Sequence, residues 1–110
     1  MKREYLGDFE QLIILALLRL EGDAYGMRVR LEIATRTGRD IAIGAVYTTL
    51  ERLETKGMVR SSTEEKVEGS RAKRIFCPTP RGRRALAASC EALASMSAGL
   101  NLSGASWKSS

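Results

Sequence analysis

With 110 residues, 44% of them hydrophobic, the chain can form one compact domain with one appended element, so wholesale disorder is excluded. The formal net charge is +5, and residues 71–84 carry basic side chains and no acid, which favours an anionic partner such as nucleic acid. The sequence has no histidine, and Cys77 and Cys90 lie outside any zinc spacing, so no enzyme, metal or cofactor site is indicated.

The first helix is predicted over residues 8–20, with Asp8 as its N-cap or first-turn acid. Its apolar side chains cover most of the helix circumference, so it is buried on more than one side. One of these sides is expected to be a subunit interface, to which we assign Phe9 and Leu12. The apolar run over residues 12–18 is too short to span a bilayer, and the charged N-terminus is unlike a signal peptide. A cytoplasmic protein without membrane contact is therefore expected.

A second helix is predicted over residues 25–36, and Gly38 suits the left-handed position that ends such a helix. Tyr25 and Gly26, at its start, offer backbone N–H groups that can bind an anion. A third helix is predicted from residue 44 to Gly57. The second and third helices have the order of a helix-turn-helix pair.

The third helix is amphipathic, with an apolar stripe at Val46, Leu50 and Leu53. The side chains assigned to its free face are small, hydroxylated or basic: Ala45, Thr48, Thr49, Arg52 and Lys56. Such a face can enter a DNA major groove, so we predict base readout by Ala45, Thr48, Thr49 and Arg52. Tyr47 is placed to donate its hydroxyl to a phosphate. The alternative is an ordinary core helix with a half-buried Tyr47.

Two short strands are predicted next, over residues 58–62 and 73–77, joined by a polar loop. Three helices followed by this hairpin indicate a mainly α fold with a small β-hairpin, the winged helix-turn-helix. Arg71, Lys73 and Arg74 are expected to meet the DNA backbone or minor groove. The alternative is a salt-bridged wing, with partners available at Glu64, Glu65 and Glu68.

A fourth helix is predicted over residues 81–97, with Thr79 as N-cap and Pro80 at its first position. We expect its apolar residues Leu86, Leu93 and Met96 to pack against a second copy, because a protruding helix cannot bury its own stripe. The alternative is that it folds back on its own domain. The predicted units are therefore a winged helix-turn-helix over 1–78, a dimerisation helix over 79–98 and a flexible tail over 99–110, which contains Trp107.

Several blocks of the chain closely resemble the PadR family of bacterial transcriptional regulators. The resemblance covers roughly residues 5–90 and rests on LGDFE at 6–10, IILALL at 13–18, AYGM at 24–27, TGR at 37–39, GAVYTTLERLETKG at 44–57, GSRAKRIF at 69–76 and TPRG at 79–82. The chain departs from the family pattern at Ile75-Phe76, where an aromatic pair is usual, and at Pro78. It ends soon after one C-terminal helix, as in the short subfamily.

The resemblance implies a homodimeric repressor of a nearby gene, bound to a pseudo-palindromic operator in double-stranded DNA. It places the following residues in DNA-facing motifs: Tyr25, Gly26, Gly44, Ala45, Tyr47, Thr48 and Thr49. In this family a small molecule often relieves repression, and here a small apolar effector would bind among apolar residues of the first and fourth helices at the dimer interface. The alternative function is a winged-helix protein-interaction module without specific DNA binding.

Overall fold

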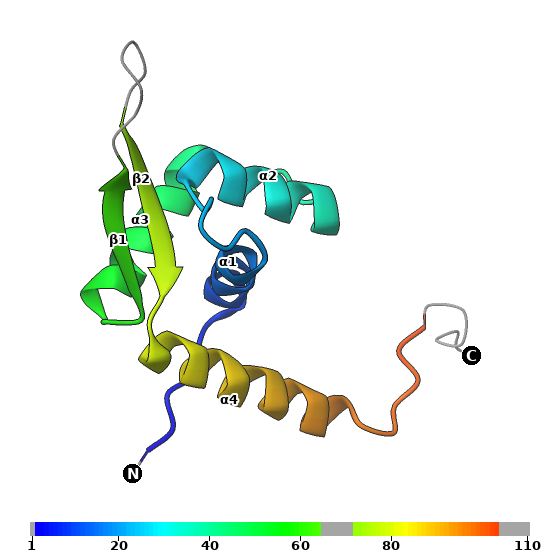
Figure 1. Ribbon diagram of the computed structural model, residues 1–110. Coiled ribbons are helices and arrows are strands. Elements are labelled where there is room, and N and C mark those ends of the chain that lie inside the picture. Colours follow the sequence, from blue (N-terminus) through cyan, green and yellow to red (C-terminus); the bar gives the residue numbers. More distant parts are fainter. Residues whose placement is uncertain (1, 65–71, 104–110) are drawn as a thin grey trace.

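A computed structural model describes residues 2–64 and 72–103 (Figure 1). The elements follow the predicted order: α1 (Asp8–Arg19), α2 (Gly26–Thr37), α3 (Ile43–Thr55), β1 (Val59–Glu64), β2 (Lys73–Pro78) and α4 (Pro80–Ser97). The two strands pair antiparallel, from Val59 opposite Pro78 to Glu64 opposite Lys73. The predicted mainly helical fold with one small hairpin is confirmed. In the part of the chain that the structure describes, no helix is both long and apolar enough to cross a membrane.

The helix ends follow from local chemistry that the sequence already carries. Gly7 precedes α1, and its N–H donates to Glu10 Oε1 at 2.9 Å, so Asp8 is a first-turn acid and not the N-cap. Gly38 ends α2 with φ of 73°, the predicted left-handed conformation. Thr79 caps α4 by accepting from the Gly82 N–H at 3.1 Å. Each cap satisfies a backbone group that a helix end leaves without an intrahelical partner.

The core is built from the inward faces of all six elements. Its most buried side chains are apolar and come from the three N-terminal helices and the hairpin: Ile13, Ile14, Leu17, Val29, Val46, Leu50, Leu53, Val59 and Phe76. Phe76 is the largest of them, and its backbone N–H donates to the Ala24 carbonyl at 2.9 Å. The hairpin is therefore fixed to the α1–α2 connection as well as to the core, which a two-stranded sheet requires because it is not stable alone.

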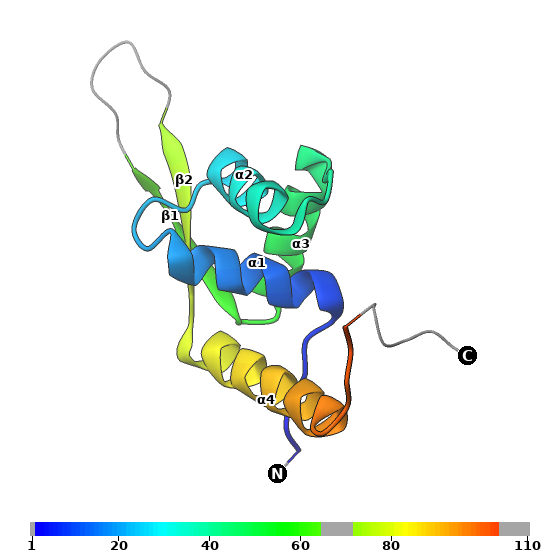
Figure 2. The same cartoon turned by 90° about the vertical axis from the view of Figure 1, so that its right-hand side faces the viewer.

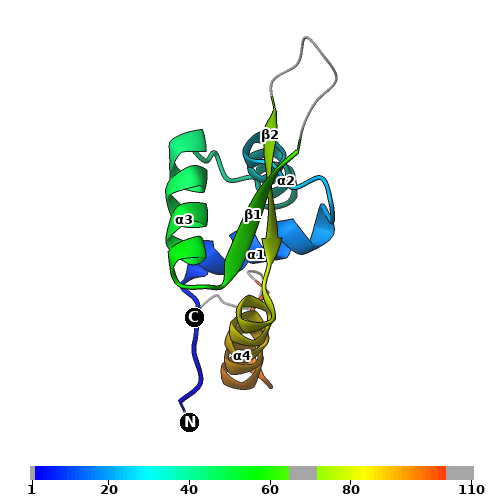
Figure 3. The same cartoon turned by 60° about the vertical axis from the view of Figure 1, so that its left-hand side comes forward.

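The hairpin stands beside α3 and points away from α4 (Figures 1 and 3). Both strands are one residue longer than predicted: β1 begins at Val59 and continues to Glu64, and β2 includes Pro78, which the sequence placed after the strand. Pro78 is the last residue of β2 and lies opposite Val59. The proline thus limits the strand only at its end, a position that this residue tolerates.

The first half of α4 packs against the same core, beside α1 (Figure 2). The Leu6 N–H donates to Ser89 Oγ at 2.8 Å, and this buried hydroxyl donates to the Ala85 carbonyl at 2.8 Å. Leu86 is only 6% exposed and belongs to the chain's own core, so its predicted place on a free dimerisation face is wrong. The second half of α4 is bare, with Leu93 60% and Met96 79% exposed.

Candidate nucleic-acid interface

α3 presents one face to the core and one to solvent at the outer edge of the domain (Figure 3). Val46, Leu50 and Leu53 are completely buried, as the apolar stripe predicts. The following residues of α3 are exposed: Gly44, Ala45, Tyr47, Thr48, Glu51, Arg52 and Thr55. A helix with a short, polar outer face beside a hairpin has the arrangement by which winged helix-turn-helix proteins reach a DNA groove.

Thr49 differs from its prediction, because it is 4% exposed and lies among the core residues. It is three residues after Val46 and four before Leu53, so the helical period places it on the buried face. The expectation that Thr49 reads a base is therefore wrong. Glu51, which the sequence reasoning left out, lies on the exposed face close to Thr48, and its position can be found from the same period.

Tyr47 packs directly over the start of α2. A Cβ added at Gly26 would lie 2.3 Å from the Tyr47 hydroxyl oxygen, a contact that only a glycine avoids. The Tyr47 side chain is 38% exposed, so it covers Gly26 and still borders solvent. Lys73, on β2, places its Nζ 4.0 Å from the centroid of the Tyr25 ring. These four residues come from three elements and the α2 N-cap, and they meet at one corner beside the first turn of α2, whose N–H groups favour an anion.

Replacing Gly26 with alanine should displace Tyr47 with little loss of stability, because the clashing atoms are the far end of a side chain that can rotate. If Tyr47 binds a phosphate, operator affinity should fall by about tenfold, the cost of a hydrogen bond to a charged group. Fluorescence anisotropy and thermal unfolding measure the two effects. In a Tyr47→Ala background, Gly26→Ala should cause no further loss of operator affinity. Fully additive losses would show that Gly26 does not act through Tyr47. Gly7→Ala is the matched control, since its Cβ meets only ordinary contact distances.

The wing cations are not all free to meet DNA. Arg74 pairs with Glu54 and Glu51 of α3, at 2.6 and 3.7 Å. The Arg74 guanidinium thus has partners within the chain, and its expected phosphate contact stays a prediction. Arg71, Glu65 and the other central loop residues lie outside the described residues, as does Trp107.

A second ion-pair cluster connects α1 to the C-terminal half of α3. The Glu10 carboxylate accepts from Lys56 Nζ at 3.0 Å and lies 4.0 Å from an Arg52 nitrogen. Burial acts to raise the pKa of Glu10, but the Gly7 N–H and the two cations outweigh it and hold the pKa below its ordinary value. Arg52 is thereby held near the exposed face of α3, with its side chain half exposed.

A family model described as the transcriptional regulator PadR-like family matches residues 14–88. The chain belongs to this PadR-like family. Its members are transcriptional regulators and not enzymes, in agreement with the reading of the composition. The expected winged helix-turn-helix fold is likewise that of the solved PadR relatives.

Individual relatives agree with the family assignment. The transcriptional regulator Rv3488 of Mycobacterium tuberculosis (strain ATCC 25618 / H37Rv) is 36% identical over 66 residues, which are 60% of this chain and 59% of that protein. A PadR family regulator from Eggerthella lenta DSM 2243 is 28% identical, with a TM-score of 0.63 over 78% of this chain and 73% of that one. A transcriptional regulator from Clostridium thermocellum is 25% identical, with a TM-score of 0.67 over 79% and 81%.

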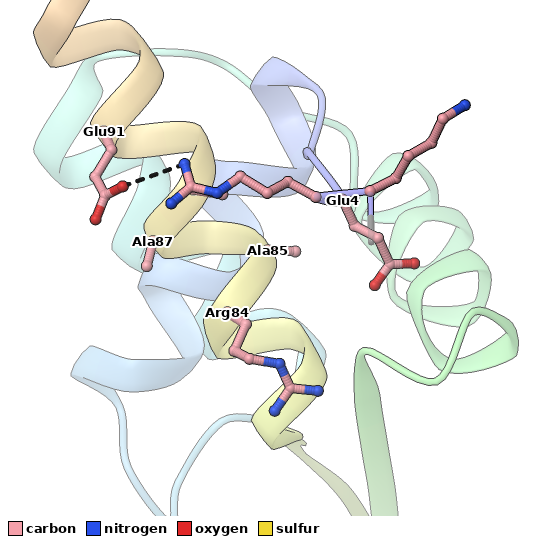
Figure 4. A pocket seen from close by; sticks show the side chains of 8 residues that line it. Glu4, Arg84, Ala85, Ala87 and Glu91 are labelled. Atoms are coloured by element: carbon pink, nitrogen blue, oxygen red, sulfur yellow. Dashed lines mark ion pairs between the residues drawn. The ribbon is translucent and has the colours of Figure 1, made fainter.

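This PadR-like chain also has a hollow of about 430 Å³ between its N-terminal segment and α4 (Figure 4). Arg3 spans it to pair with Glu91 at 3.4 Å. The hollow has a small apolar floor and a charged rim: Lys2, Arg3, Glu4, Arg84, Ala85, Ala87, Ala88 and Glu91. It is therefore unlike the apolar effector site expected between the first and fourth helices, which stays a prediction.

Proposed function

We propose that this PadR-like protein is a cytoplasmic, homodimeric repressor that binds a pseudo-palindromic operator near the gene it controls. The observation that carries the proposal is the exposed face of α3, flanked on one side by the hairpin and bordered by the corner of Tyr25, Gly26, Tyr47 and Lys73. A groove-reading helix, a phosphate-binding corner and a wing thus lie next to one another. A sequence-specific regulator needs both base contacts, which read the sequence, and phosphate contacts, which fix its position on the DNA.

Each part of this surface has a distinct task. Thr48 and Ala45, on the outer face of α3, contact base edges in the major groove. Tyr47 donates its hydroxyl to a phosphate beside the α2 N-terminus, where Lys73 adds positive charge. Arg52 lies at the edge of the same face, half exposed, and contacts base edges as the sequence predicts. Because phosphate contacts fix the register, losing one should weaken binding to every sequence, whereas a base contact should alter preference.

Dimerisation is supported by the bare second half of α4. Leu93 and Met96 are exposed there, and the apolar stripe that starts in the core at Leu86 continues into them at helical spacing. A second copy that packs on this stripe would bury it. Two copies joined away from the hairpin would present two α3 helices to successive half-sites about 34 Å apart.

The competing function is a protein-interaction module that uses the same winged-helix surface. Two observations favour it: Arg52, Lys56 and Arg74 are already compensated by acids of this chain, and Met27 and Leu31 are exposed on α2. Such a module would bind DNA weakly and without sequence preference, so the test below separates the two functions.

Fluorescence anisotropy on duplexes tiled across the DNA upstream of the gene should find one tile bound tightly, with affinity that falls steeply with salt. Tyr47→Ala should weaken this binding by about tenfold or more, because a hydrogen bond to a charged group is removed. Tyr5→Ala is the matched control, since Tyr5 is an exposed tyrosine of the N-terminal segment. Equally weak binding of all tiles would contradict the repressor and favour the protein-interaction module.

A further inference from the structure

Arg74, on the wing, makes two contacts with the recognition helix α3 and two within the hairpin. Its Nη2 donates to Glu54 Oε1 at 2.6 Å, and its Nη1 lies 3.7 Å from Glu51 Oε2. Its Nε donates to Ser61 Oγ at 3.1 Å, and the guanidinium carbon lies 4.9 Å from the centroid of the Phe76 ring. Every nitrogen of the guanidinium thus has a partner within the chain.

The contacts close into a ring that joins three elements. Ser61, on β1, donates its hydroxyl to Glu54 Oε2 at 2.8 Å, so both carboxylate oxygens of Glu54 are used. Arg74 is on β2, Ser61 on β1, and Glu54 on α3. Thr63 lies opposite Arg74 in the hairpin, and Ser61 is two strand positions further toward the core, opposite Phe76. The ring therefore holds both strands of the wing against one turn of the recognition helix.

We propose that Arg74 is a positioning residue that sets the angle of the wing against α3, and is not a phosphate contact. The inference rests on the proposed function and refines it. A planar guanidinium that is hydrogen-bonded to a carboxylate and stacked on a ring is a rigid connection, which a lysine cannot reproduce. A phosphate that took Arg74 from Glu54 and Glu51 would leave two carboxylates beside the DNA. With the ring intact, the wing meets DNA at a fixed spacing from Thr48.

The sign of the Glu54→Gln effect distinguishes the two roles. If Arg74 binds phosphate and Glu54 competes for it, Glu54→Gln frees the guanidinium, removes a negative charge and tightens operator binding. If Arg74 positions the wing, the same change loosens the ring and weakens binding by about tenfold. Glu32→Gln is the matched control, because Glu32 forms an Arg–Glu pair with Arg36 on α2 and reports the general effect of removing one negative charge.

Arg74→Lys provides a second test that keeps the charge. As a phosphate contact it should be nearly neutral, whereas the positioning role predicts a loss comparable to that of Glu54→Gln. The slope of log affinity against log salt should stay within about 0.3 of the wild type, since a lost phosphate contact would lower it by about 0.9. Tighter or unchanged binding in Glu54→Gln, or wild-type operator affinity in Arg74→Lys, overturns the inference.

A measurement without DNA separates failure of this inference from failure of the proposed function. In the free protein, backbone amide order parameters of residues 60–63 and 73–76 should fall in both variants and stay at wild-type values in Glu32→Gln. If the wild type binds no operator but these amides still loosen, the proposed function fails and the positioning role of Arg74 stands. If the amides are unchanged, the ring does not hold the wing and the inference fails.

Discussion

Leu93→Glu should convert the proposed homodimer to a monomer and weaken operator binding by about a hundredfold, the scale on which linked half-sites raise affinity. The physical reason is the apolar stripe of α4. Its first half, at Leu86, is covered by the chain's own core, and its continuation at Leu93 and Met96 is bare. A glutamate there would have to bury an unpaired carboxylate in the interface, which costs far more than the lost leucine contacts. Sedimentation gives the mass, and anisotropy gives the operator affinity.

The matched control is Ser95→Glu, which adds the same charge to the same helix. Ser95 is two residues from Leu93, so the helical period turns it toward the opposite face. It should leave both the dimer and the operator affinity close to those of the wild type. A Leu93→Glu protein that remains dimeric would show that the two copies meet elsewhere, and the α4 interface would have to be abandoned.

Much of the fold is predictable because its signals are local. The stripe at Val46, Leu50 and Leu53 fixes which side of α3 is buried, and this is confirmed. Gly38 and Thr79 end or start a helix through their own backbone and hydroxyl chemistry, so no knowledge of tertiary contacts is needed. The predicted end of β2 was wrong by one residue, because a proline restricts a strand but can occupy its last position, as Pro78 does.

The parts of the site that sequence reasoning missed depend on tertiary packing. Thr49 was placed outside by its polarity, although its angle on the helix places it inside, where it is buried. Leu86 belongs to the apolar stripe of α4, which looks the same along its whole length in the sequence. Only the position of α1 decides which half of that stripe is buried within the chain. The partners of Arg74 are 20 and 23 residues away along the chain, so its charge could be seen in the sequence but its neutralisation could not.

Gly82→Ala should destabilise the whole domain by about 3 kcal/mol, at the upper end of overpacking costs. A Cβ at this position would lie 2.1 Å from the Met58 carbonyl oxygen and 3.0 Å from its carbon. The clash at Gly26 is with a side chain that can rotate, whereas this clash is with backbone atoms, which cannot move aside by a change of rotamer. The first turn of α4 would have to move off the chain that enters β1, which is also held by the Thr79 N–H on the Met58 carbonyl at 3.0 Å. Thermal unfolding should show a midpoint about 15 °C lower.

Gly44→Ala separates this steric effect from the general effect of replacing a helical glycine. A Cβ at Gly44 meets nothing within 4 Å, so alanine there should stabilise the domain by about 0.5–1 kcal/mol. Opposite signs for the two substitutions are therefore expected, although both replace a glycine in the first turn of a helix. A normal unfolding midpoint for Gly82→Ala would mean that α4 sits further from β1 than described. The continuity between the core and the bare stripe of α4, on which the proposed dimer depends, would then be lost as well.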